Sequence, residues 1–147
     1  MALSVPRNAP KEFILSNNLN EIIFLIGKVP HEGLEEWYNA ADFILSGSHY
    51  EGGGTVISEA MSCGCIPIVT AIHSFKKMTN GKAGFLFEAG NEHALAEILM
   101  TTSSLDMDAE REKVLKQFND ELSFAAIGRK INKLLTTLNP GKTHVPH

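Results

Sequence analysis

Continuous apolar runs alternate along the chain with segments whose apolar residues recur at helical spacing. Such runs are typical of strands that are covered on both faces of a sheet, and they occupy residues 21–29, 43–47, 66–71 and 84–87. Helical spacing predicts helices over residues 34–41 and 54–63. The apolar faces of these two helices carry Leu34, Trp37, Tyr38 and Ala41, and Val56, Ile57, Ala60 and Met61. We expect Trp37 to lie in the core.

Helical patterns dominate the last third of the chain. Asn91 is placed to cap a helix that carries apolar residues to Leu99. Asp106 leads a second helix, with acidic residues first and lysines later, the order that the helix dipole favours. A third, long amphipathic helix follows over residues 124–138. Residues 10–16 allow a short helix, and residues 74–83 are expected to form either a short helix or an irregular segment.

This alternation predicts an α/β protein with a Rossmann-like parallel sheet and flanking helices. Only four strands are visible, so the first βα units of such a domain are expected to be lacking. We divide the chain into a lead-in segment over residues 1–20, one domain over 21–139 and a disordered tail over 140–147.

Composition narrows the possible functions. The chain has 147 residues, 44% of them hydrophobic, and a formal net charge of −4, which does not favour nucleic acids or anionic membranes as partners. No apolar run approaches the ~20 residues of a membrane-spanning helix. Cys63 and Cys65 are too close for an unstrained disulfide. We expect reduced thiols and a cytoplasmic location.

The segment with the most distinctive chemistry is His49 to Glu59, with the sequence HYEGGGTVISE. It lies between a predicted strand and a predicted helix, where parallel sheets bind ligands. Glycines let a ligand approach the backbone, and the amides at a helix start bind anions. Glu51 and Glu59 can each accept two hydrogen bonds from a vicinal diol. A nucleoside diphosphate sugar has both groups. By spacing alone, a flexible turn and a solvated Glu59 explain the pattern equally well.

Other chemistries have weaker support. Two cysteines without a second pair are a weak zinc signal. Ser48, His73 and Asp42 lack the sequence of a nucleophile elbow. The glycine triplet does not match the dinucleotide fingerprint, and the segment around Lys28 is no Walker loop. His49 lies two residues from Glu51 and is a candidate ligand contact.

The stretch over residues 41–71 resembles the nucleotide-sugar-binding core of retaining glycosyltransferases of family four, which have the GT-B fold. The resemblance rests on Glu51-Gly52-x-Gly54, seven residues between two glutamates, Glu59-Ala60-Met61, Cys63-Gly64 and Pro67-Ile68-Val69. It extends on both sides to cover residues 20–138. The chain therefore looks like most of one half of a GT-B fold, the C-terminal half.

The resemblance implies roles for individual residues. Glu51 would act as the catalytic residue that contacts the donor sugar, and Glu59 would hold the ribose. Backbone amides of Gly53 and Gly54 would bind sugar hydroxyls. Backbone amides of Thr55 and Val56 would bind the diphosphate. Lys28 and Val29 would lie beside the nucleobase. The family's cationic Gly-Arg…Lys-Gly segment does not occur in this sequence.

The expected function follows from the resemblance. The chain would bind the nucleotide sugar for a retaining hexosyltransferase of polysaccharide or glycoconjugate synthesis, with no metal and no cofactor. Its partners would be the nucleotide sugar and a missing N-terminal acceptor-binding domain, with peripheral membrane association possible for the intact enzyme. The isolated chain is expected to be inactive. The alternative is a non-catalytic nucleotide-sugar-binding module or a degenerate fragment.

Overall fold

The computed structural model describes residues 9–138, which fall into two compact units, 9–33 and 34–138. The first unit contains helix α1 (Ala9–Ser16) and the 3-10 turn η1 (His31–Gly33). The second unit contains the sheet and all the remaining helices. The predicted tail at 140–147 lies outside the described residues. The predicted boundary near residue 20 stays a prediction.

The sheet of the second unit has three parallel strands in the order β1-β2-β3. They are β1 (Phe43–Ser46), β2 (Ile66–Thr70) and β3 (Phe85–Phe87). Every residue of β2 is buried, because this strand has a neighbour on each side and helices pack over it. Three of the four predicted strands are therefore confirmed.

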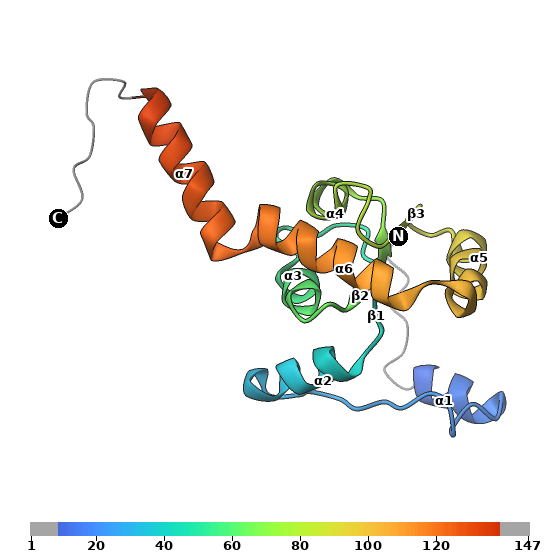
Figure 1. The fold of residues 1–147 in the computed structure, drawn as a ribbon. Coiled ribbons are helices and arrows are strands. Elements are labelled where there is room, and N and C mark those ends of the chain that lie inside the picture. Colours follow the sequence, from blue (N-terminus) through green and yellow to red (C-terminus); the bar gives the residue numbers. More distant parts are fainter. Residues whose placement is uncertain (1–8, 139–147) are drawn as a thin grey trace. The chain divides into compact units, whose positions relative to one another are not determined.

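Helices precede, connect and follow these strands (Figure 1). The helix α2 (Leu34–Ala40) leads into β1, and α3 (Thr55–Ser62) and α4 (His73–Thr79) connect the strands. After β3 come α5 (Glu92–Thr101), the 3-10 turn η2 (Thr102–Ser104), α6 (Met107–Gln117), the π-helical turn η3 (Phe118–Leu122) and α7 (Phe124–Leu138). The two predicted caps are confirmed, since Asn91 accepts a hydrogen bond from Ala94 N and Asp106 from Ala109 N.

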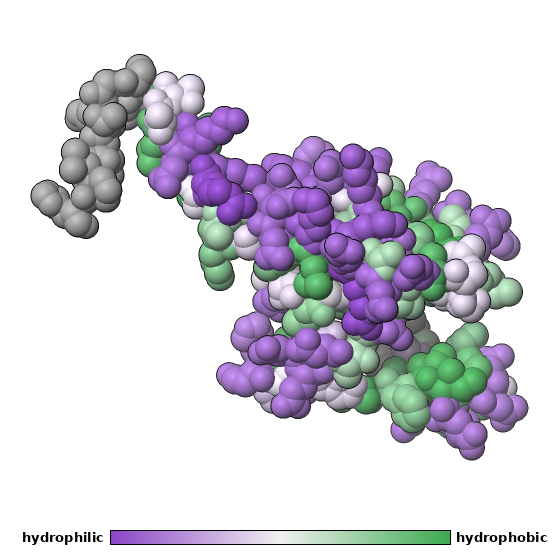
Figure 2. All heavy atoms as spheres, viewed as in Figure 1, coloured by the Kyte–Doolittle hydropathy of each residue, from purple (hydrophilic) through white to green (hydrophobic). Residues whose placement is uncertain are grey.

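The core forms where α3, α4 and α6 pack against β2. It contains Ile57, Met61, Ile66, Val69, Phe75, Met78, Ala83 and Val114. The outward face of α6 is hydrophilic in the space-filling view (Figure 2). Gly84, with φ +86°, lies so close to β2 that a Cβ atom there would be 2.2 Å from the Pro67 carbonyl oxygen. A glycine is therefore required where β3 meets β2.

The strand predicted over residues 21–29 is wrong. These residues form a turn and then a stretch without regular structure, and Phe24 is 67% exposed. A strand needs a neighbour for its backbone N–H and C=O groups. The first unit offers only a helix and a 3-10 turn, so the apolar run has no strand to pair with inside that unit.

Two side chains differ from the predicted core. Trp37 is 50% exposed, although α2 forms where its spacing predicts. Val56 is 54% exposed, whereas Ile57, Ala60 and Met61 of the same helix are buried. Both residues lie at the edges of their apolar faces. Helical spacing identifies such a face but not how much of its edge is covered.

Candidate functional site

The loop between β1 and α3 is fixed at its base by hydroxyl groups. Thr70, fully buried at the end of β2, donates a hydrogen bond to the Ser48 carbonyl oxygen at 2.5 Å. The hydroxyls of Ser46 and Ser48 lie 3.1 Å apart and share a further hydrogen bond. The carboxyl ends of two neighbouring strands thus hold the start of the glycine loop.

Gly54 is the glycine of the triplet that the structure requires. Its φ is +62°, and a Cβ atom there would lie 2.8 Å from Met78 Cε and 3.1 Å from Phe75 Cε1. Helix α4 therefore packs directly on the end of the loop. No atom lies within 4 Å of the corresponding position at Gly52. Gly52 leaves open space where a ligand can approach the backbone.

The start of α3 combines a carboxylate with amide groups. The Gly54 amide donates to Glu51 Oε1 over 3.4 Å, a long and hence weak hydrogen bond. The Gly54 carbonyl accepts the first helical bonds, from Ile57 and Ser58. Within the described part of the chain, the amides of Thr55 and Val56 make no hydrogen bond. They form the positive end of the helix dipole, where an anion is stabilised.

These groups line a pocket of about 380 Å³ at the carboxyl end of β1. Its lining includes Glu51, Gly54, Thr55 and Val56, together with Ile44, Leu45, Ser46, Ile57 and Phe75. Four of the predicted site residues are thus gathered around one cavity. The wall that strand β1 and Phe75 supply is largely apolar, and the polar groups come from the loop and the start of α3.

Glu59 lies further along α3, outside the lining of this pocket. Its neighbour is Tyr38 of α2, the helix that packs against α3. Burial raises the pKa of Tyr38, and so do the charge of Glu59 and the hydrogen bond with its carboxylate. The Tyr38 hydroxyl group is protonated at neutral pH and can donate to the Glu59 carboxylate.

The remaining predicted site residues lie elsewhere. Gly53 lines a different pocket. The His49 ring lies beside Gly90, since a Cβ atom at Gly90 would be 3.6 Å from His49 Cε1. His49 lines neither pocket. Lys28 and Val29 belong to the first unit, so their part in the site stays a prediction.

Two residues near the site, Phe75 and Tyr38, are not predicted as site residues from the sequence. Phe75 lies in a segment for which both a short helix and an irregular structure are expected, and only the packing of α4 on Gly54 brings it to the pocket. Tyr38 was assigned to an apolar face. Its hydroxyl group is the signal in the sequence that could have indicated a polar contact.

The cysteines take no part in this cavity. Both are free thiols, and Cys65 is fully buried. Burial raises the pKa of the Cys65 thiol to about 11, although the charge of Arg111 opposes the shift. Among residues 9–138, no cluster of three or more His, Cys, Asp or Glu side chains could hold a metal ion. In the same residues, no helix is long and apolar enough to span a membrane.

Two curated relatives resemble the chain in sequence. The amylovoran biosynthesis glycosyltransferase AmsK of Erwinia amylovora is 28% identical over 138 residues, which covers 84% of this chain and 34% of that protein. The D-inositol 3-phosphate glycosyltransferase of Streptosporangium roseum is 26% identical over 85 residues, 57% of this chain and 20% of that protein. The chain thus spans about a third or less of these relatives.

Solved structures match the fold. Sucrose-phosphate synthase from Thermosynechococcus elongatus aligns with a TM-score of 0.72 and 24% identity, over 92% of this chain and 35% of that one. The C-terminal domain of the group 1 glycosyl transferase LpcC from Francisella tularensis aligns with a TM-score of 0.65 and 21% identity, over 82% and 66%. These likenesses confirm the expected Rossmann-like half of a GT-B fold.

A family model covers most of the chain. Residues 7–119 match the model of the glycosyl transferases group 1. The chain therefore belongs to the glycosyl transferases group 1 family.

Proposed function

We propose that the chain binds the nucleoside diphosphate sugar for a retaining hexosyltransferase. The observation that carries this proposal is the pocket in which the Glu51 carboxylate and the amides of Thr55 and Val56 meet. A carboxylate suits sugar hydroxyls, and amides at a helix start suit a diphosphate. One ligand that contains both groups can satisfy the whole site.

The same geometry suits the chemistry of glycosyl transfer. When the sugar leaves its donor, negative charge develops on the diphosphate. Amides that are already oriented stabilise this charge without reorganisation. The long bond between Glu51 and the Gly54 amide costs little to exchange for a sugar hydroxyl, so Glu51 can turn toward the donor.

Glu59 serves the ribose in this proposal. Tyr38 lies beside the Glu59 carboxylate, whose two oxygens can accept further hydrogen bonds from a ligand. Lys28 and Val29 would contact the base. The amides of Gly53 and Gly54 would bind the sugar hydroxyls, and His49 would contact the ligand near Glu51. These roles, and the absence of a metal or cofactor, are proposals.

The activity of the whole protein is also a proposal, because the chain spans only about a third of AmsK. We propose transfer of a hexose in polysaccharide or glycoconjugate synthesis in the cytoplasm, with an acceptor-binding domain as partner. The name of AmsK supports the polysaccharide role. The second candidate is a binding module without turnover.

Calorimetry with nucleoside diphosphates on the full chain tests donor binding. Glu59→Ala removes the proposed ribose contact, which we expect to weaken binding by about 1.5 to 3 kcal/mol, the contribution of hydrogen bonds to a charged group. Glu97→Ala, an exposed position on α5, is the matched control and should bind normally. Equal affinity of both variants would refute the role of Glu59. No binding by the unaltered chain would refute the donor site.

A further inference from the structure

A second pocket lies against the glycine loop and shares no lining residue with the first. It has a volume of about 420 Å³. The loop contributes Gly52 and Gly53, and α4 contributes His73, Ser74 and Lys77. Glu121 and Leu122 of η3 and Lys130 of α7 line the rest, with Met78. Three parts of the chain that are distant in sequence, namely the loop, α4 and the consecutive elements η3 and α7, therefore line one cavity.

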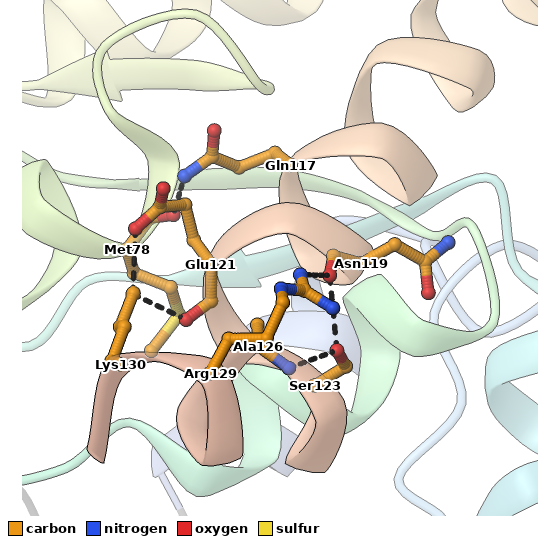
Figure 3. Close-up of polar contacts among 8 residues, drawn as sticks. All are labelled: Met78, Gln117, Asn119, Glu121, Ser123, Ala126, Arg129 and Lys130. Atoms are coloured by element: carbon orange, nitrogen blue, oxygen red, sulfur yellow. Dashed lines mark hydrogen bonds and ion pairs between the residues drawn. The ribbon is translucent and has the colours of Figure 1, made fainter. Parts of the chain in front are cut away.

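The charged groups of this pocket are two lysines and one glutamate, which leave one excess positive charge. Lys130 Nζ donates to Glu121 Oε2 at 2.6 Å and to the Glu121 carbonyl oxygen at 2.8 Å (Figure 3). These two bonds hold the ammonium group in place and compensate the Glu121 carboxylate. An ammonium group has three donors, so one remains for a ligand.

Further donors face no acceptor. In the part of the chain that the structure describes, Lys77 makes no side-chain hydrogen bond or ion pair, and the amides of Gly52 and Gly53 make no hydrogen bond. Open space surrounds both glycines, since the nearest atom to a Cβ at Gly53 is Thr55 Oγ1 at 3.9 Å. Ser74 and His73 add side chains that can donate.

We propose that this second pocket binds a phosphoryl group. Lysine ammonium groups and glycine amides are donors that phosphate oxygens commonly accept from proteins. The pocket volume admits the phosphoryl group together with part of the molecule that carries it. That molecule is either the nucleoside diphosphate or a separate phosphorylated compound. The two pockets share no lining residue, although the donor proposal also uses the Gly53 amide, and both lysines belong to the second pocket alone.

Amide NMR of the full chain, titrated with inorganic phosphate at constant ionic strength, tests the proposal. We expect the Gly52 and Gly53 amides to shift. Lys77→Gln should weaken phosphate binding by about threefold to fivefold, the upper range for one exposed charge contact. Lys76→Gln removes the same charge from the next residue, which does not line the pocket, and should change the affinity less than twofold. Both substitutions are at exposed positions, so the fold is preserved.

Unshifted glycine amides, or equal effects of the two lysine substitutions, would overturn the site. Phosphate-induced shifts at Gly52 and Gly53 without shifts at Thr55 and Val56 separate this site from the donor pocket. Displacement of inorganic phosphate by a nucleoside diphosphate would identify the donor as the source of the phosphoryl group. Displacement by a hexose phosphate alone would identify a separate phosphorylated compound.

Discussion

Gly54 connects the ligand loop to the hydrophobic core, because Phe75 and Met78 close over its α-carbon. Its φ of +62° is a conformation that other residues adopt at a cost of roughly 1 to 2 kcal/mol. A methyl group there must also displace Met78. We expect Gly54→Ala to lower the free energy of unfolding by about 2 to 4 kcal/mol, measured by urea denaturation. Gly52→Ala, which meets no atom, is the control. Similar losses from both would contradict this role.

Cys65 makes stability depend on pH in the alkaline range. Burial raises the pKa of its thiol to about 11 in the folded chain. The thiol of the unfolded chain therefore ionises at lower pH, and this ionisation stabilises the unfolded state as pH rises. The free energy of unfolding should fall by up to about 2 to 3 kcal/mol between pH 9 and 11. Tyrosines and lysines titrate there too, so the comparison is with Cys65→Ala. An unchanged pH dependence in that variant would contradict the assignment.

At the scale of elements, α6 and α7 differ in what they contribute to stability. Val114 of α6 is fully buried in the core, whereas α7 has Phe124 95% exposed and Leu134 63% exposed. Helix α7 contacts η3. In Figure 1 it follows α6 along the chain and extends away from it.

We expect Val114→Ala to cost about 1 to 3 kcal/mol of unfolding free energy, because it leaves a cavity. Leu134→Ala should cost less than about 0.5 kcal/mol, since the side chain is exposed. Thermal and urea denaturation of the two variants measure the difference. A large loss from Leu134→Ala would mean that the face of α7 is covered in the isolated chain.

Local apolar patterns predicted strands correctly where the fold supplies neighbouring strands, and failed where it does not. The apolar run Ile66–Thr70 forms strand β2, which pairs with β1 on one side and β3 on the other. Residues 21–29 have an equally apolar pattern, but pairing depends on neighbours that a local pattern does not specify. The same limit applies to the site. The motif predicted Glu51 and the start of α3, whereas the packing of Phe75 on Gly54 needed the fold.

For the whole molecule, we expect the two units to differ in their resistance to proteolysis. Residues 23–30 have no regular structure and expose apolar side chains, among them Phe24 and Leu25. Chymotrypsin should therefore cut the full chain first in this segment and leave residues 34–138 intact. Mass spectrometry of the early products identifies the cut. First cleavage inside the sheet unit, for example at Phe85 or Phe87 of β3, would contradict the division.

The central claim for the whole molecule is that one end of the sheet binds a nucleoside diphosphate. The most direct measurement is an amide NMR map of the full chain during titration with a nucleoside diphosphate. We predict that Thr55, Val56 and Glu59 shift at saturating ligand, while helix α5 (Glu92–Thr101) does not. Shifts confined to α5 or other segments away from α3, with Thr55 and Val56 unmoved, would contradict the claim.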